Sequence, residues 1–135
     1  MAGTFSNYLE NKLLDYAFSV AAFTPAATLY IGLSTTTIAD DGSNITEPTA
    51  MGYARVAITN NATNFPAASD GVKANGAAIA FAAATGDWGT ITDFFISDAA
   101  SGGNIYVAGA LTTPKIVTEG DTPNIAINGL GLSLA

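Results

Sequence analysis

The sequence contains no cysteine and no histidine. Without cysteine the chain cannot form disulfides, use a thiolate nucleophile or bind a metal through sulfur. Without histidine it lacks the commonest general base and the commonest metal ligand in proteins. We therefore predict a protein that is not an enzyme, with no catalytic, cofactor-binding or metal-binding residue and no cofactor.

Charge is also scarce, because charged residues make up only 11% of the 135 residues, whereas about 25% is usual in a soluble domain. The net charge is −7, and the four basic residues, Lys12, Arg55, Lys73 and Lys115, are scattered along the chain. Phosphate contacts need clustered basic residues, so we expect no nucleic-acid partner. A largely uncharged surface suits contact between proteins, which favours a homo-oligomer or another lattice-bound state.

No apolar run approaches the roughly 18 residues of a membrane-spanning helix. The N-terminal residues show no basic segment followed by an apolar one, so no secretory signal is evident. An acidic chain is also repelled by anionic lipid. We expect no membrane partner.

One helix is predicted over residues 7–20. Asn7 is a suitable N-cap, and Glu10 stands three residues later, as in a capping box. The helical apolar stripe comprises Leu9, Leu13, Tyr16, Ala17 and Val20. Thr24-Pro25 is expected to stop the helix, because the residue before proline avoids helical geometry. The favoured interpretation is a helix lying on the edge or end of a β core. The alternative is a helix that docks a neighbouring subunit.

From Thr28 onward the apolar residues alternate with a period of two, which predicts seven or eight short strands. The turn clusters between them contain Asp-Gly and Gly-Gly pairs, such as Asp70-Gly71 and Gly102-Gly103. Short strands without intervening helices are typical of a mainly β fold, either an antiparallel β-sandwich or a jelly-roll-like barrel. We predict a single domain over residues 1–135, with the helix at 7–20 and the β-sandwich at 28–135.

The least regular segment, residues 36–51, is predicted to form a loop arm within the sandwich. Ordering a long polar excursion costs conformational entropy, which a partner surface could offset. The apolar candidates for partner contact in and beside this arm are Ile38, Ile45, Pro48, Met51 and Tyr53. Its acidic cluster of Asp40, Asp41, Asn44 and Glu47 lacks EF-hand spacing, so a solvated turn is favoured over a Ca²⁺ site.

Two further features invite a functional interpretation. Asp93 and Asp98 flank Phe94-Phe95-Ile96, and paired carboxylates hydrolyse glycosidic bonds when they are suitably spaced. The simpler interpretation is that Asp93 is an outward-facing strand residue and Asp98 is a turn residue. Trp88 either stacks on a ligand or closes the end of the core, and the second role is favoured because Ile91 and Phe94 follow it closely. Tyr30, Tyr53 and Tyr106 either edge an interface or lie on strand surfaces.

Six segments resemble, in order, a family of small virion structural proteins of tailed bacteriophages, whose members are commonly labelled phage tail fibre proteins. These segments are residues 3–15, 27–35, 52–56, 84–92, 97–104 and 109–115. The resemblance implies a structural component of the virion, assembled in the cytoplasm of the bacterial host. The implied partners are other virion proteins, either the major capsid protein or tail proteins. It carries no catalytic residue.

Three functions follow from these observations. A fibre needs reach from a coiled coil or a repeated shaft, and the sequence has neither. A compact acidic domain with one arm suits a capsid decoration, or cement, protein on the outer surface of the head, which is the preferred prediction. A tail fibre or receptor-binding protein is the alternative, and a tail enzyme that degrades host glycans is the third.

Overall fold

The computed structural model describes residues 1–134 and confirms a mainly β fold with one N-terminal helix. The strands are β1 (Ala2–Phe5), β2 (Thr28–Ser34), β3 (Val56–Thr59), β4 (Val72–Ala74), β5 (Ile79–Ala80), β6 (Gly89–Ser97), β7 (Ile105–Val117), β8 (Asn124–Ile125) and β9 (Gly131–Ser133), and the helix is α1 (Asn7–Ser19). Within the described residues this makes eight strands from Thr28 onward, in line with the predicted seven or eight, and one further strand, β1, before the helix.

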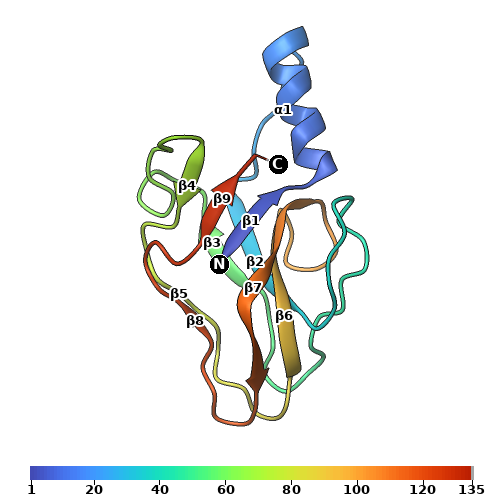
Figure 1. Cartoon of the computed structure of the whole chain (residues 1–135), viewed down its shortest axis with the longest axis vertical. Coiled ribbons are helices and arrows are strands. Elements are labelled where there is room, and N and C mark those ends of the chain that lie inside the picture. The colour runs from blue at the N-terminus through green and yellow to red at the C-terminus, as the bar shows by residue number, and fades with distance from the viewer. Residues whose placement is uncertain (135) are drawn as a thin grey trace.

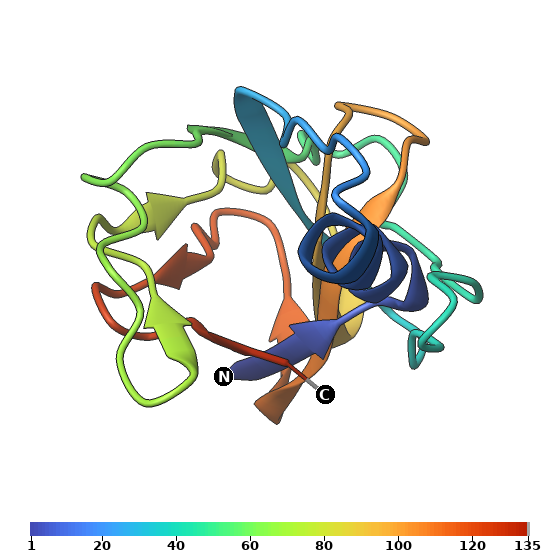
Figure 2. The same ribbon diagram turned by 90° about the horizontal axis from the view of Figure 1, so that it is seen from above.

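Seven strands form one sheet in the order β3-β2-β6-β7-β1-β9-β4, and β5 pairs with β8 alone. The large sheet curls into a half-barrel around the core, as the view from above shows (Figure 2). Of the two predicted architectures, the barrel-like one therefore describes the molecule better. Every strand pair is antiparallel except β1 and β9, which run parallel and bring the two ends of the chain together (Figure 1).

The centre of the sheet is the β2–β6–β7 unit. Leu33 of β2 lies opposite Phe94 of β6, and both are buried in the core. Phe95 points to the other face of the sheet, because neighbouring strand residues alternate. It lies opposite Gly32, where a Cβ atom would collide with the Phe95 ring, so glycine is required there.

Strand β7 is one long strand that runs through Pro114. The register with β6 shifts, from Lys115 opposite Ile91 to Ala110 opposite Asp93. Such an irregularity tolerates a proline, which cannot donate to a regular ladder. Strands β1 and β4 were not predicted, because neither shows a clear alternation of apolar and polar residues.

The helix begins at Asn7 and ends at Ser19, close to the predicted range of 7–20, but the predicted cap and stop signal are wrong. Ser6 is the N-cap, with extended backbone, and its hydroxyl accepts a hydrogen bond from the Leu9 amide at 3.4 Å. The helix ends at Ser19, five residues before Thr24, because Val20 takes the left-handed conformation (φ 54°) and forms the C-cap. No helix among residues 1–134 is long and apolar enough to cross a membrane.

Candidate functional site

Two segments leave the curled sheet, the loop arm of residues 36–51 and the helix α1 (Figure 1). The predicted contact residues in and beside the arm differ in burial. Pro48 is buried, Ile38, Ile45 and Tyr53 are half-buried, and Met51 is exposed. Their role in partner contact stays a prediction.

The arm is held at its base by hydrogen bonds from its own domain. The Ser34 hydroxyl oxygen accepts from the amides of Thr36 and Thr46, each at 3.1 Å. The Thr35 amide donates to the Thr46 carbonyl at 2.9 Å. The arm thus has hydrogen-bonding support from its own domain.

Arg55 fastens the end of the arm to the sheet. Its guanidinium donates twice to the Glu47 carboxylate, from Nε to Oε1 at 3.0 Å and from Nη2 to Oε2 at 2.8 Å. Its Nη1 donates to three oxygens at the end of β6 and in the β6–β7 turn: Ser97 Oγ, Ala99 O and Gly102 O. The guanidinium also lies 4.8 Å from the centroid of the Phe95 ring. Arg55 thus joins three parts of the chain with its donors directed at specific acceptors.

Glu47 is the acidic partner in this network. Burial raises the pKa of its carboxyl, but the hydrogen bonds from Arg55 and Tyr53 outweigh that effect and hold the pKa below its ordinary value. The Tyr53 hydroxyl donates to Glu47 Oε1 at 2.7 Å and accepts from the Leu33 amide at 2.9 Å. Burial, followed by the contact with Glu47, raises the pKa of Tyr53. Tyr53 and Arg55 are therefore internal supports of the arm.

Trp88 closes the core beside the same network, as predicted, because only 4% of it is exposed. Its ring meets Tyr53 edge-on at 5.3 Å and Phe81 at 6.4 Å between centroids. Its Nε1 donates to the Met51 carbonyl at 2.8 Å. The tryptophan thus ties the end of the arm to the core.

The two candidate carboxylates, Asp93 and Asp98, lie in different environments. Asp98 is a turn residue, as predicted, since its oxygens accept from the amide and the side chain of Asn104 at 2.7 and 2.9 Å. Asp93 was predicted to be an outward-facing strand residue, but it is buried, with only 4% exposed. It lies opposite Ser34 in the sheet, which is where the arm returns.

Asp41 and Asn44, two members of the predicted acidic cluster of the arm, form hydrogen bonds with different residues. Asp41 accepts from the Ser43 amide at 2.9 Å, and its hydrogen bonds with Ser43 lower its pKa. The Asn44 side chain donates to the Thr37 carbonyl at 2.7 Å. Within residues 1–134, no three His, Cys, Asp or Glu residues gather in a way that could hold a metal ion.

The helix behaves differently from the arm. Its first turns are anchored by buried Leu9 and by Tyr8, which stacks on Tyr106 with 6.0 Å between ring centroids. Tyr106, one of the three tyrosines considered for an interface, is itself buried, and its hydroxyl accepts from the Ala26 amide. The base of α1 is therefore fixed, while its second half rises above the sheet (Figure 1). The helix therefore sits at the end of the β core, as the favoured interpretation had it, but only its first half packs on that core.

We call residues 14–20 the α1 tip. Its four large apolar side chains are exposed: Leu14 by 55%, Tyr16 by 57%, Phe18 by 84% and Val20 by 86%. With about 3.6 residues per turn, Tyr16 and Val20 continue the buried Leu9 face, whereas Leu14 and Phe18 lie on the other side. An apolar helix end of this kind is normally covered by another surface.

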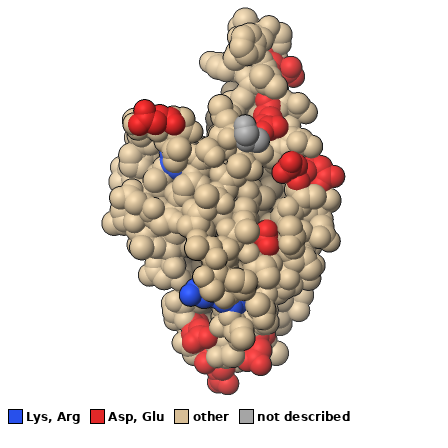
Figure 3. All heavy atoms as spheres, in the orientation of Figure 1, with Lys and Arg blue, Asp and Glu red and all other residues tan. Residues whose placement is uncertain are grey.

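The predicted apolar stripe contains Tyr16 and Val20 but not Leu14 and Phe18. A signal was present, since the chain carries no charged residue from Tyr16 to Ala39. The surface as a whole is also sparsely charged, because uncharged residues dominate the drawn face and the acidic residues form small separate groups (Figure 3).

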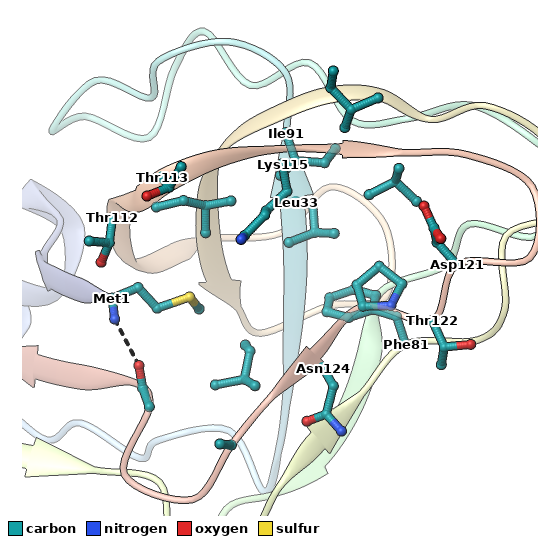
Figure 4. A pocket seen from close by; sticks show the side chains of 17 residues that line it. Met1, Leu33, Phe81, Ile91, Thr112, Thr113, Lys115, Asp121, Thr122 and Asn124 are labelled. Atoms are coloured by element: carbon teal, nitrogen blue, oxygen red, sulfur yellow. Dashed lines mark hydrogen bonds between the residues drawn. The ribbon is translucent and has the colours of Figure 1, made fainter.

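A cavity of about 540 Å³ opens on the β7–β8 side of the half-barrel (Figure 4). Leu33, Phe81, Ile91 and Ile125 give it an apolar floor, while Thr112, Thr113, Lys115, Asp121 and Asn124 add polar groups. The Lys115 side chain points into it (Figure 4). Neither the cavity nor its residues were predicted, because its walls come together only when β7 and β8 are placed on the curled sheet.

Two comparisons with known proteins complete these observations. Residues 4–133 match a family model described as "Podophage GP4 fiber I protein gp80", which spans nearly the whole chain. No curated protein matches the chain.

Proposed function

Because the chain belongs to the family of the podophage GP4 fiber I protein gp80 and is a structural component of the phage virion, we propose that it is a subunit of the fibre apparatus. The family match is the observation that carries this proposal, because its description names a fibre protein. The virion is the place where the protein acts.

The α1 tip supports an assembly role. Leu14, Tyr16, Phe18 and Val20 stand in solvent although the base of the helix is firmly packed. Aromatic side chains are enriched at the centres of protein interfaces. We propose that this tip is the contact through which the subunit joins its neighbours in the particle.

The residues that resemble the fibre proteins support a structural rather than a chemical role. Arg55, Trp88 and Asp98 lie in three of the resembling segments, and all three hold the arm, the core or a turn in place. We propose that the protein is not an enzyme and that Asp93 and Asp98 have no catalytic role.

A capsid decoration role is the second candidate, and it was preferred from the sequence. It is favoured by the shape, since the described residues form a curled seven-stranded sheet, a separate β5–β8 pair and one helix, with neither a repeated shaft nor a coiled coil. The net charge of −7 also suits the outer surface of a DNA-filled head.

Copy number and position in the particle test these proposals. Quantitative mass spectrometry would give the copies per virion, and gold-labelled antibody in electron microscopy would give the position. A fibre subunit predicts label at the tail and few copies, and a decoration protein predicts label over the head and hundreds of copies. Protein found only in infected cells and not in particles would overturn both.

A further inference from the structure

The α1 tip requires an apolar cover that the subunit itself does not supply. It projects from a fixed base, and the stretch from Leu14 to Val20 rises roughly 9 Å along the helix axis. Phe18 and Val20 are among the most exposed large apolar side chains of the described residues. A rigid apolar projection of this length fits a cavity better than a flat surface.

The cavity beside β7 and β8 has the matching properties. Its volume of about 540 Å³ lies within the range of about 300–1,000 Å³ in which proteins enclose other groups. Its floor of Leu33, Phe81 and Ile91 is apolar, and exposed Ile116 lines its wall. It can therefore receive one or two large apolar side chains.

The charges at the α1 tip and at the β7–β8 cavity indicate which occupant fits the cavity. The end of a helix carries a partial negative charge, the last turn of α1 contains no basic residue, and Asp15 adds a full negative charge. The cavity contains Lys115, which makes no ion pair within residues 1–134. Asp121, also at the cavity, is held by the Thr118 amide at 2.9 Å. The negative helix end is thus complementary to Lys115, while the Asp121 carboxylate at the same cavity is occupied by the Thr118 amide.

We propose that the α1 tip of one subunit inserts into the β7–β8 cavity of a second copy of this chain. This inference rests on the assembly role proposed above and names the partner of the α1 tip. Two copies with a net charge of −7 repel each other except where charges are opposite or absent. The apolar residues of the tip carry no charge, and Lys115 carries a charge opposite to the net charge of the partner copy. The contact is head-to-tail, so every subunit offers one tip and one cavity, and subunits join into a ring or a row.

Head-to-tail contact makes a prediction that symmetric pairing does not. The tip variant Phe18→Ser keeps an intact cavity, whereas the cavity variant Lys115→Glu/Ile116→Asp keeps an intact tip. All three positions are exposed, so the fold should persist, which circular dichroism and urea unfolding would verify. Each variant alone should be monomeric, yet an equimolar mixture should form a one-to-one dimer that grows no further. Lys73→Glu, a charge reversal on β4 away from the cavity, is the matched control.

Charge exchange gives a second readout. Asp15→Lys should weaken self-association about tenfold, although a basic residue near the end of a helix favours the helix itself. Combining Asp15→Lys with Lys115→Glu should restore association, because the two charges are exchanged.

Sedimentation velocity of the full chain at low ionic strength would measure these species. Growth of wild-type oligomers with concentration, monomeric variants and a dimer in the mixture would support the proposal. A cavity variant that associates like wild type would overturn it, as would a mixture that stays monomeric. If wild type is monomeric throughout but Phe18→Ser is lost from virions, this inference fails and the assembly role stands. If the protein associates head-to-tail but is absent from virions, the virion role fails and the self-contact stands.

Discussion

The loop arm and helix α1 both leave the curled sheet, but they are stabilised in opposite ways. The arm is an irregular segment whose sequence looks unsupported, yet Ser34, Tyr53, Arg55 and Trp88 bind it to the core. The helix has regular hydrogen bonding and a good apolar stripe, yet only its base is packed. Regular secondary structure therefore does not indicate burial here, and irregular structure does not indicate availability to a partner.

This contrast changes where contact with other virion proteins is expected. The arm forms its hydrogen bonds within the subunit, and its Pro48 is buried and therefore unavailable to a partner. The α1 tip instead leaves large apolar side chains in solvent. Stability should therefore depend on the arm, and assembly should depend on the helix.

The largest loss of stability is expected from Arg55→Ala. This change leaves Glu47 without its ion partner and removes the donor to three further oxygens. The Arg55 side chain is only 6% exposed, and breaking a buried pair from one side costs about 3–5 kcal/mol in unfolding free energy. Urea unfolding would measure it. Lys73→Ala is the control, and an equal effect of both changes would show that the arm is not held by Arg55.

A smaller loss is expected from Tyr53→Phe. The ring stays in its cluster with Phe81 and Trp88, but the Leu33 amide and Glu47 lose the hydroxyl. Leaving a buried amide without its partner costs about 1–3 kcal/mol. Tyr30→Phe is the matched control, because no hydrogen bond of its hydroxyl is found within residues 1–134. Equal unfolding midpoints for the two variants would contradict this role of Tyr53.

The arm should also weaken in acid. Because the folded pKa of Glu47 lies below its ordinary value, the carboxylate stabilises the fold above the unfolded pKa of about 4.3. That contribution is lost as pH falls through the folded pKa. Urea midpoints between pH 6 and pH 3 should fall more steeply for wild type than for Glu47→Gln. Parallel slopes would mean that Glu47 does not contribute to the acid sensitivity.

The smallest effect on stability is expected at the α1 tip. Phe18 is 84% exposed, so Phe18→Ser should change the unfolding free energy by no more than about 0.5 kcal/mol. Leu9→Ser at the buried base of the same helix should cost several times more, because it removes apolar contact and buries a hydroxyl. Similar losses at both positions would mean that the tip is packed against its own subunit.

Much of the fold could be predicted from the sequence because it depends on local patterns. The alternation in Leu29–Leu33 and Thr92–Ile96 marked the central strands, and Trp88 was correctly placed in the core. Strand β1 was missed because its pairing depends on β9, more than a hundred residues away.

The interface candidates were harder to predict, because burial depends on where an element ends relative to its neighbours. The stripe of Leu9, Leu13, Tyr16 and Val20 is continuous in sequence, but only its beginning meets the domain. The support of the arm comes from Arg55 and from the turn after β6, which its own sequence does not reveal. The cavity could not be predicted either, because its walls come from segments that lie far apart in the sequence.

Incorporation of the Phe18→Ser variant into virions tests most directly whether assembly depends on the α1 tip while stability depends on the arm. Phage lacking the wild-type protein would be complemented with this variant or with wild type, and copies per purified particle would be counted by mass spectrometry. We expect Phe18→Ser to be folded, with an unfolding midpoint like that of wild type, and to be strongly depleted from particles. Incorporation at the wild-type level would contradict the assignment of assembly to the α1 tip.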